Sequence, residues 1–441
     1  MTIAVLTGVF ILLLFLRVPI AFCIGASALC AMLVSLPFDP SAITIAQRVG
    51  TSITSFTLLA IPFFVLAGRL LATGGVARRL IDFAVVTVGF LPGGLAVTNV
   101  LANMLFGAVS GSAAAAASGI GGFMIPAMEE KRYPKEFAAA LTVTSATTGL
   151  LIPPSNVFIV YAMVAGGVSV GALFVAGYLP GILLGLALMG IAVVVTQKNG
   201  YGVRTPAPTL RQFARSLFGV IPTILMLILV MGGIVTGFFT ATEASAISVV
   251  YAFALSMFYY REVKWRDLPQ ILVETASTTG MVFLLIGTSI AMAWIFAYAN
   301  VPQFIDTFIR GVSSNPIIIL LIINLILLAV GTFMDMTPAI LIFTPIFLPI
   351  AQDLAPALGT TPELMKYQFG IIIVFNLCIG LCTPPVGTVL FIGCGIAKIS
   401  ITRIIRPLIP LFVAAGVALL LVTYVPWLST WLPRDVFKMI K

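Results

Sequence analysis

Apolar stretches long enough to cross a lipid bilayer recur along the whole of this sequence, for example at 218–238 and 408–424. One helical crossing needs about 20 mostly apolar residues. Of the 441 residues, 61% are hydrophobic and 8% are charged. A soluble domain carries about a quarter charged residues, so this chain could not cover a water-facing surface. The sequence therefore predicts an all-α polytopic membrane protein.

Five clusters of basic residues separate these apolar stretches, and the net charge of the chain is +9. Lys and Arg are enriched in cytoplasmic loops, so we place the five clusters on the cytoplasmic side. They are Arg69, Arg78 and Arg79; Lys131, Arg132 and Lys135; Lys198, Arg204, Arg211 and Arg215; Arg261, Lys264 and Arg266; and Lys398, Arg403 and Arg406. Charge-poor connections near 37–41, 166–171 and 360–363 then lie on the opposite side. The enrichment of Lys and Arg in cytoplasmic loops accounts for the positive net charge, so we expect no nucleic-acid partner.

The sequence has no histidine, which excludes His-based triads, zinc sites with His ligands and imidazole proton relays. The five cysteines lie in apolar stretches and are interpreted as packing residues. An intramembrane aspartyl protease needs two facing aspartates, whereas Asp335 is the only aspartate deep in an apolar hairpin. We therefore expect a protein that is not an enzyme.

A weak internal repeat divides the chain. The stretch GLLIPPSN (149–156) matches GLCTPPVG (380–387), and each follows an apolar stretch interrupted by Ser, Thr or Gly, at 107–119 and 331–339. Repeats of this kind are typical of secondary transporters. The sequence predicts two repeats, each with about five spans, a re-entrant helical hairpin and a broken helix.

The repeat and the charge pattern together predict the domain organisation. The first repeat covers 1–197, and its hairpin near 96–128 opens toward the cytoplasm. A cytoplasmic link follows at 198–215. The second repeat covers 216–441, and its hairpin near 316–353 opens toward the periplasm. An odd number of crossings in each repeat makes the two halves inverted.

Each half contains a Pro-Pro pair within an apolar stretch, Pro153–Pro154 and Pro384–Pro385. Proline has no N–H and interrupts a helix. At membrane depth such a break persists only where it is buried or lines a cavity. The freed carbonyl groups suit a desolvated cation, and the N-terminal ends of half-helices suit an anion. A proline kink that is simply packed by neighbouring helices would be a good explanation for one such break. It is a poor explanation for two breaks at matching places in the two halves.

Hydroxyl groups are concentrated at the interruption in the first hairpin. Ser110, Ser112 and Ser118 lie among alanines and glycines and could supply oxygen ligands, or simply allow close helix packing. Asn99 and Asn103 precede this tip and could equally form hydrogen bonds between helices.

Charged side chains within apolar segments are costly and usually functional. Asp335, with Thr337 beside it and Thr383 on the broken helix, could hold Na⁺, whereas a protonatable Asp would serve H⁺ coupling. Glu243 looks like a second buried acid, for which a structural partner is the better interpretation. Arg69 is expected to extend to the cytoplasmic interface.

Several separate runs resemble the large membrane subunit of TRAP transporters, the DctM-like family. They are GAVSGSAAAAASGIGGFMIPAM, GLLIPPSN, FFTATEASA, GTFMDMTPAILIFTPIFLPI and GLCTPPVG, and they agree in order and spacing over nearly the whole chain. The resemblance implies an elevator-type secondary transporter of the bacterial inner membrane, driven by a Na⁺ gradient. Such a subunit works with a small four-helix membrane subunit and a periplasmic substrate-binding protein that delivers an organic acid, for example a dicarboxylate or a sugar acid. The chain opens directly on the first span of the large subunit, so a separate small subunit is expected.

The resemblance also implies roles at matching positions. Substrate contacts are expected from Ser110, Ser112, Ser155, Asn156 and Asp335. Contacts to Na⁺, the transported coupling ion, are expected from Ser110, Pro153, Asn156, Asp335, Thr337, Thr383 and Gly387. A stand-alone Na⁺- or H⁺-coupled carboxylate carrier of similar hairpin architecture is the alternative function.

Overall fold

The computed structural model describes residues 1–203 and 206–440, and these residues form helices with no β-strand among them. Arg204 in the predicted link and Lys441 at the end of the predicted second repeat lie outside the described residues. Within the described ranges, 8 helices are long and apolar enough to cross a membrane, and two bent helix pairs pass the same test as pairs. The chain is a multi-pass membrane protein.

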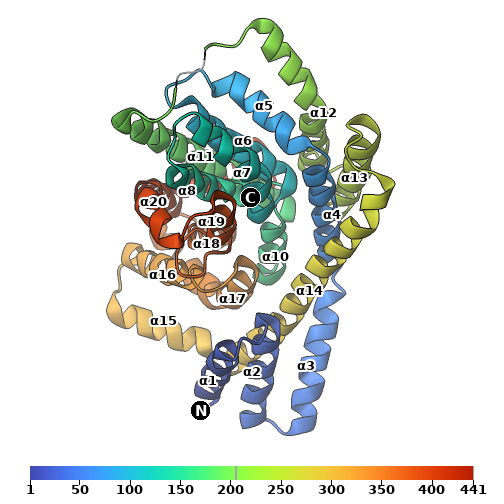
Figure 1. Ribbon diagram of the computed structural model, residues 1–441. Helices are drawn as coiled ribbons and strands as arrows, with labels where there is room; N and C mark the ends of the chain where they lie inside the picture. Colours follow the sequence, from blue (N-terminus) through green and yellow to red (C-terminus); the bar gives the residue numbers. More distant parts are fainter. Residues whose placement is uncertain (204–205, 441) are drawn as a thin grey trace.

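An outer layer of helices, called the frame below, combines the first spans of both halves. The first half supplies α1 (Thr2–Phe15), α2 (Ile20–Ser35), α3 (Phe38–Ile53) and α4 (Ala60–Thr73), and the second supplies α12 (Leu210–Val235), α13 (Ala241–Ala254) and α14 (Leu268–Tyr298). The two halves interlace, because α13 packs on α4 whereas α14 packs on α2 and α3 (Figure 1). The frame is therefore one unit built from both halves.

The remaining long helices form a second unit, called the bundle, beside the frame (Figure 1). From the first half come α6 (Gly94–Ser110), α7 (Ala113–Glu130), α8 (Lys135–Ala146), α9 (Thr148–Leu151), α10 (Asn156–Ala165) and α11 (Val170–Asn199). From the second come α16 (Pro316–Gly331), α17 (Met336–Leu354), α18 (Pro362–Gly380), α19 (Thr388–Ala397) and α20 (Ile401–Tyr424). Each half thus contributes a hairpin, a broken helix and a long final helix in the same order.

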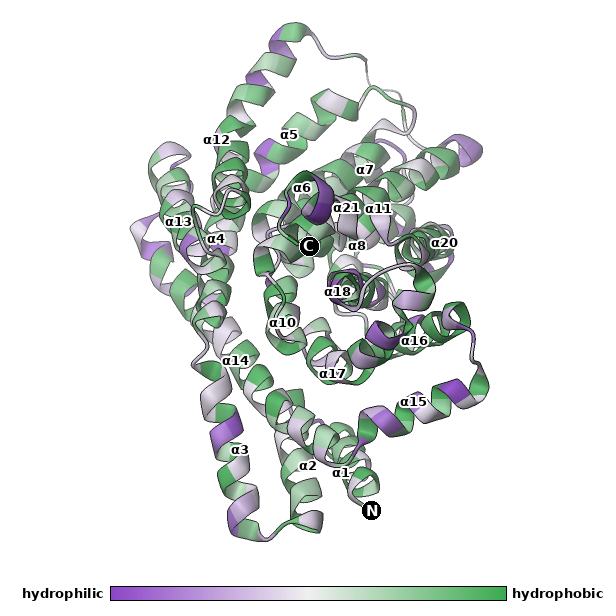
Figure 2. Ribbon diagram, turned by 180° about the vertical axis from the view of Figure 1, so that it is seen from behind, coloured by the Kyte–Doolittle hydropathy of each residue, from purple (hydrophilic) through white to green (hydrophobic). Residues whose placement is uncertain are grey.

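Two amphipathic arms connect the frame to the bundle, α5 (Val76–Val88) and α15 (Val301–Val312). On α15, Phe304 and Phe308 are exposed, while Arg310 Nε donates to Asp306 Oδ1 at 2.7 Å on the polar side (Figure 2). A helix with one apolar and one charged face is suited to the membrane interface. Short helical segments complete the chain at Phe56–Leu59, Leu255–Tyr259, Trp265–Asp267, Pro356–Leu358, Trp427–Trp431 and Leu432–Val436.

Matching polar contacts attach each hairpin to the broken helix of its own half. Asn103 Nδ2 donates to Ser145 Oγ at 2.9 Å, and Asn376 Nδ2 donates to Asn324 Oδ1 at 2.7 Å. All four side chains are buried, so leaving either bond unmade would cost the desolvation of a polar group. Asn103 therefore has the interhelical role that was one of its two interpretations.

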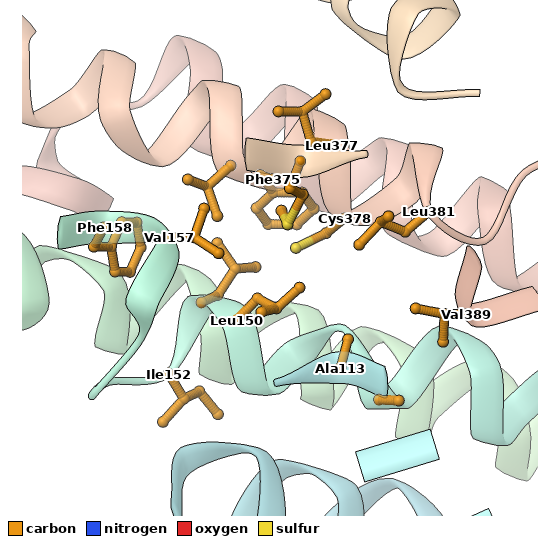
Figure 3. Close-up of a cluster of buried hydrophobic side chains, with 14 of the residues drawn as sticks. Ala113, Leu150, Ile152, Val157, Phe158, Phe375, Leu377, Cys378, Leu381 and Val389 are labelled. Atoms are coloured by element: carbon orange, nitrogen blue, oxygen red, sulfur yellow. The ribbon is translucent and has the colours of Figure 1, made fainter. Parts of the chain in front are cut away.

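The two broken helices pack directly on each other behind their breaks. Side chains of both fill the space between them, with Leu150 from the first and Phe375 and Leu381 from the second (Figure 3). The thiol of Cys378 is buried, free of any disulfide and 3.5 Å from the carbonyl oxygen of Thr147. This cysteine has the packing role predicted for it.

Glu243 differs from the sequence-based expectation, because its side chain is exposed rather than buried. It caps α13 instead: the backbone N–H of Thr240 donates to Glu243 Oε2 at 2.8 Å, and the Thr240 hydroxyl lies 2.9 Å from the same oxygen. The first N–H groups of a helix lack intrahelical partners, and this reciprocal capping box satisfies two donors. The expectation of a structural partner is confirmed, and that of burial is wrong.

Candidate functional site

The first hairpin turns at Ser110–Gly111–Ser112, between α6 and α7. Gly111 has a φ of +60°, a region that side chains disfavour. Ser112 is the N-cap of α7 and accepts a hydrogen bond from the backbone N–H of Ala115 at 3.3 Å. A Cβ atom on Gly111 would lie 2.9 Å from the carbonyl oxygen of Pro154. The tip of the first hairpin therefore touches the first helix break.

The first break leaves polar atoms without partners. Pro153 and Pro154 have no N–H, so the carbonyl groups one turn earlier lose their helical donors. In the described part of the chain, Ser155 Oγ and Asn156 Oδ1 are buried and have no hydrogen-bond partner. Buried polar atoms are nearly always paired, so unpartnered oxygens at a break require an explanation. A cation or a substrate hydroxyl would satisfy them.

The second hairpin turns between Gly331 and Met336. Asp335 is the N-cap of α17, but its carboxylate makes no capping hydrogen bond. The side chain of Asp335 is exposed to a cavity and is available to a ligand. The backbone N–H of Val386 donates to the carbonyl oxygen of Thr332 at 3.3 Å, which attaches the second tip to the second break.

Backbone oxygens converge in the second break. A Cβ atom on Gly387 would lie 2.6 Å from the carbonyl oxygen of Leu381 and 2.9 Å from that of Thr383. Glycine is required there because the backbone approaches itself so closely. Because Pro385 has no N–H, the Leu381 carbonyl also lacks the donor that a continuous helix would supply. The Thr383 hydroxyl donates to the carbonyl oxygen of Ile379 at 2.7 Å, which leaves its lone pairs free to accept or to bind a cation.

Both hairpin tips border one cavity of ≈ 770 Å³ between the frame and the bundle. Its volume is in the range of small-molecule sites. The cavity is lined by five of the predicted site residues, which are Ser110, Ser112, Asn156, Asp335 and Thr337. The other four predicted site residues lie in the two helix breaks and do not line the cavity; they are Pro153, Ser155, Thr383 and Gly387. The structure thus brings both halves of the predicted site to one place.

The frame supplies the other wall of the cavity, which sequence reasoning missed. Gly68, Arg69 and Thr278 line it from α4 and α14. The guanidinium of Arg69 forms an ion pair with Glu274 of α14, a partner that the sequence did not indicate. Its expected extension to the cytoplasmic interface stays a prediction. The position of Arg69 within an apolar run is the sequence signal that could have indicated its place on the cavity wall. That signal was overlooked because Arg69 was grouped with the nearby Arg78 and Arg79.

The candidate ligands are almost all neutral oxygen atoms. Within the described residues, no group of three or more His, Cys, Asp or Glu side chains could hold a metal ion. Carbonyl, hydroxyl and amide oxygens with a single carboxylate suit a hard cation of low charge better than a transition metal.

The family described as "Tripartite ATP-independent periplasmic transporter, DctM component" matches residues 7–428. The chain belongs to this family. The resemblance noted in the sequence is thereby confirmed.

Relatives of this DctM component match over nearly the whole chain. YgiK of Salmonella typhimurium is 52% identical over 98% of this chain and 97% of its own. The C4-dicarboxylate TRAP transporter large permease protein DctM of Pseudomonas aeruginosa is 39% identical over 90% and 91% of the two chains. The sialic acid TRAP transporter large permease protein SiaM of Vibrio cholerae is 35% identical over 96% of each.

The fold is also similar to that of a solved transporter. The crystal structure of the YdaH transporter of Alcanivorax borkumensis superposes with a TM-score of 0.63, covering 97% of this chain and 99% of the other. The sequence identity is 15%, so this likeness concerns the fold alone. It supports the predicted all-α polytopic fold.

Proposed function

We propose that this chain is the large membrane subunit of a Na⁺-coupled, binding-protein-dependent importer of a small organic acid. The observation that carries the proposal is the convergence of two hairpin tips and two helix breaks on one cavity. Such a constellation supplies carbonyl oxygens for a cation and half-helix N-termini for an anion. Transport of the acid is coupled to that of the cation when the two bind at neighbouring sites and each increases the affinity for the other.

Na⁺ would be held by oxygens of the tips and breaks. In the first half these are the buried Ser155 Oγ and Asn156 Oδ1, together with carbonyls freed by the prolines. In the second half they are the Leu381 and Thr383 carbonyls near Gly387, with the Asp335 carboxylate on the adjoining tip. Desolvated Na⁺ would offset the cost of an unpaired carboxylate at membrane depth.

The substrate class follows from the site and from the family. Relatives are named for C4-dicarboxylates and for sialic acid, and both are organic acids. The half-helix α10 begins at Asn156 on the cavity wall, so its N-terminal end faces the cavity and favours a negative charge. A dicarboxylate or a sugar acid matches this combination of charge and cavity size.

Transport would occur by movement of the bundle against the frame, as in an elevator. The cavity lies between these two units, and the arms α5 and α15 connect them. A movement of this kind exposes one site to each side of the membrane in turn. The complete transporter would include a small membrane subunit and a periplasmic substrate-binding protein, in the bacterial inner membrane.

The test is uptake into proteoliposomes that contain this chain, its co-encoded small subunit and the purified binding protein. Succinate, gluconate and sialic acid are offered with an inward Na⁺ gradient, with an inward H⁺ gradient, and with neither. We expect accumulation of at least one acid with the Na⁺ gradient only, and none when the binding protein is omitted. Uptake by this chain alone would favour a stand-alone carrier, and accumulation with the H⁺ gradient would replace Na⁺ by H⁺ as the coupling ion.

A further inference from the structure

Arg69 places a positive charge on the cavity wall that faces the hairpin tips. We propose that Arg69 binds a carboxylate of the transported acid, and that Glu274 occupies the guanidinium until the acid arrives. The inference rests on the proposed function and adds to it the group that recognises the anion. It also assigns that group to the frame, whereas the proposed cation ligands belong to the bundle.

The geometry leaves the guanidinium available. Arg69 Nη1 donates to a carboxylate oxygen of Glu274, and Nη2 donates to the hydroxyl of Thr278 at 3.2 Å. A guanidinium has five N–H donors, so these two bonds leave others for a second carboxylate. The side chains of Arg69 and Glu274 are 39% and 41% exposed, so the ion pair does not enclose the guanidinium. A carboxylate in the cavity can therefore compete with Glu274.

The charges that line the cavity favour such a role for Arg69. Among the described residues that line the cavity, the charged side chains are Arg69 and Asp335. Without Arg69, an acid would meet mainly apolar walls, the Asp335 carboxylate and the N-terminal end of α10, whose dipole supplies only a partial positive charge. Arginine presents a planar fork that binds a carboxylate through two parallel hydrogen bonds. Arg69 thus favours carboxylates over neutral molecules of the same shape.

The position of Arg69 brings the acid next to the first hairpin tip. A Cβ atom on the preceding residue, Gly68, would lie 2.7 Å from the carbonyl oxygen of Ser110. An acid on Arg69 would therefore touch the frame on one side and the tip on the other. If the bundle moves against the frame, this contact exists in one conformation only. Arg69 would then stabilise the loaded state in which the cavity has the shape described here.

The experiment measures acid binding to this chain in complex with its small subunit, in detergent, at saturating Na⁺. The thermal midpoint is recorded against the concentration of succinate, gluconate or sialic acid, with neutral succinamide as the matched uncharged probe. We expect at least one acid, and not succinamide, to stabilise the parent. Arg69→Gln should raise the half-saturating concentration of that acid about 10- to 100-fold, the range for a lost charge-assisted contact. Arg69→Lys keeps the charge without the fork and should give a smaller rise.

Two further variants separate anion binding from a structural ion pair. The exchange Arg69→Glu with Glu274→Arg restores the pair but moves the cation to α14, so we expect recovered thermal stability and no recovered acid binding. Glu274→Gln removes the competing carboxylate while Thr278 still holds the guanidinium. It should lower the half-saturating concentration about two- to five-fold. If Arg69→Gln alone is unstable, the neutral pair Arg69→Gln with Glu274→Gln avoids an unpaired Glu274 and serves the same comparison.

The outcomes distinguish this inference from the proposed function. A parent that binds or transports one of the three acids, with an unchanged half-saturating concentration in the Arg69→Gln protein, would overturn the inference alone. Full recovery of acid binding in the exchanged pair would do the same. A parent that neither binds nor transports any of the acids would overturn the proposed function, and the inference with it.

Discussion

Gly107 on α6 and Gly149 on α9 cross so closely that a Cβ atom on Gly107 would lie 2.3 Å from the Cα atom of Gly149. The second half repeats this contact, where a Cβ atom on Gly331 would lie 3.0 Å from the Cα atom of Gly380. Only glycine allows two backbones to meet in this way. Each hairpin is therefore fixed to its broken helix at the same point, just before the residues that border the cavity.

Substitution at this crossing should destabilise the bundle. Gly107→Ala places its new methyl group against backbone that cannot rotate away, so we expect a loss of about 1–3 kcal/mol, as in overpacked cores. The thermal midpoint in detergent measures the loss. Gly190→Ala is the matched control, because nothing lies within 4 Å of a Cβ atom on that helical glycine. Equal midpoints for the two variants would show that the crossing tolerates a side chain.

Asp335→Asn should weaken Na⁺ activation of uptake and leave folding nearly intact. The substitution keeps the size of the side chain and removes the charge. The loss of one charge-assisted contact is worth about 1.5–3 kcal/mol, which is roughly one to two decades in the half-activating Na⁺ concentration. Asp353→Asn, on the same helix and exposed, is the control. An Asp335→Asn protein with the Na⁺ curve of the parent would make this carboxylate a structural group.

The inverted arrangement predicts which side each loop faces. In a background without cysteine, Lys131→Cys should be protected from a membrane-impermeant maleimide in sealed cells, whereas Glu363→Cys should react. Both side chains are exposed, so a lack of labelling cannot be attributed to burial of the side chain. Gly166 is expected on the same side as Glu363, but its φ of +65° makes a cysteine there strained. Labelling of position 131 from outside would contradict the predicted topology.

Removal of the cap on α13 should affect stability and not coupling. Glu243→Ala deletes the acceptor for the Thr240 N–H and hydroxyl, so we expect a lower thermal midpoint and reduced yield of folded protein. Glu243→Gln keeps an acceptor and should have a smaller effect. The half-activating Na⁺ concentration should match that of the parent in both. A shifted Na⁺ curve with a normal midpoint would instead place Glu243 in the coupling pathway.

Local signals in the sequence were sufficient for much of the bundle. Pro153–Pro154 and Pro384–Pro385 interrupt helices for a reason that acts within one turn, the missing N–H. Interrupted apolar stretches likewise indicated the hairpins, and the structure has α6 and α7 at one and α16 and α17 at the other. The side of the membrane that each hairpin faces stays a prediction.

Contacts between distant segments were not predictable in this way. Arg69 and Glu274 are far apart in the sequence, and neither position by itself indicates a partner. Burial of Glu243 was expected because its neighbours in the sequence are apolar. It lies in the first turn of a helix, however, where its carboxylate can accept a hydrogen bond from the backbone N–H of Thr240. The sequence therefore predicted the half of the cavity that the bundle lines and missed the half that the frame lines.

The interlaced frame has a consequence for biosynthesis. The helix α4 packs on α13, and α2 packs on α14, so the first four helices leave the ribosome before their main neighbours exist. We expect the nascent first half to be inserted in the lipid yet incompletely assembled until α13 and α14 follow. A chain stopped within the link should then be degraded rapidly in cells, and co-expression of the second half as a separate polypeptide should protect it.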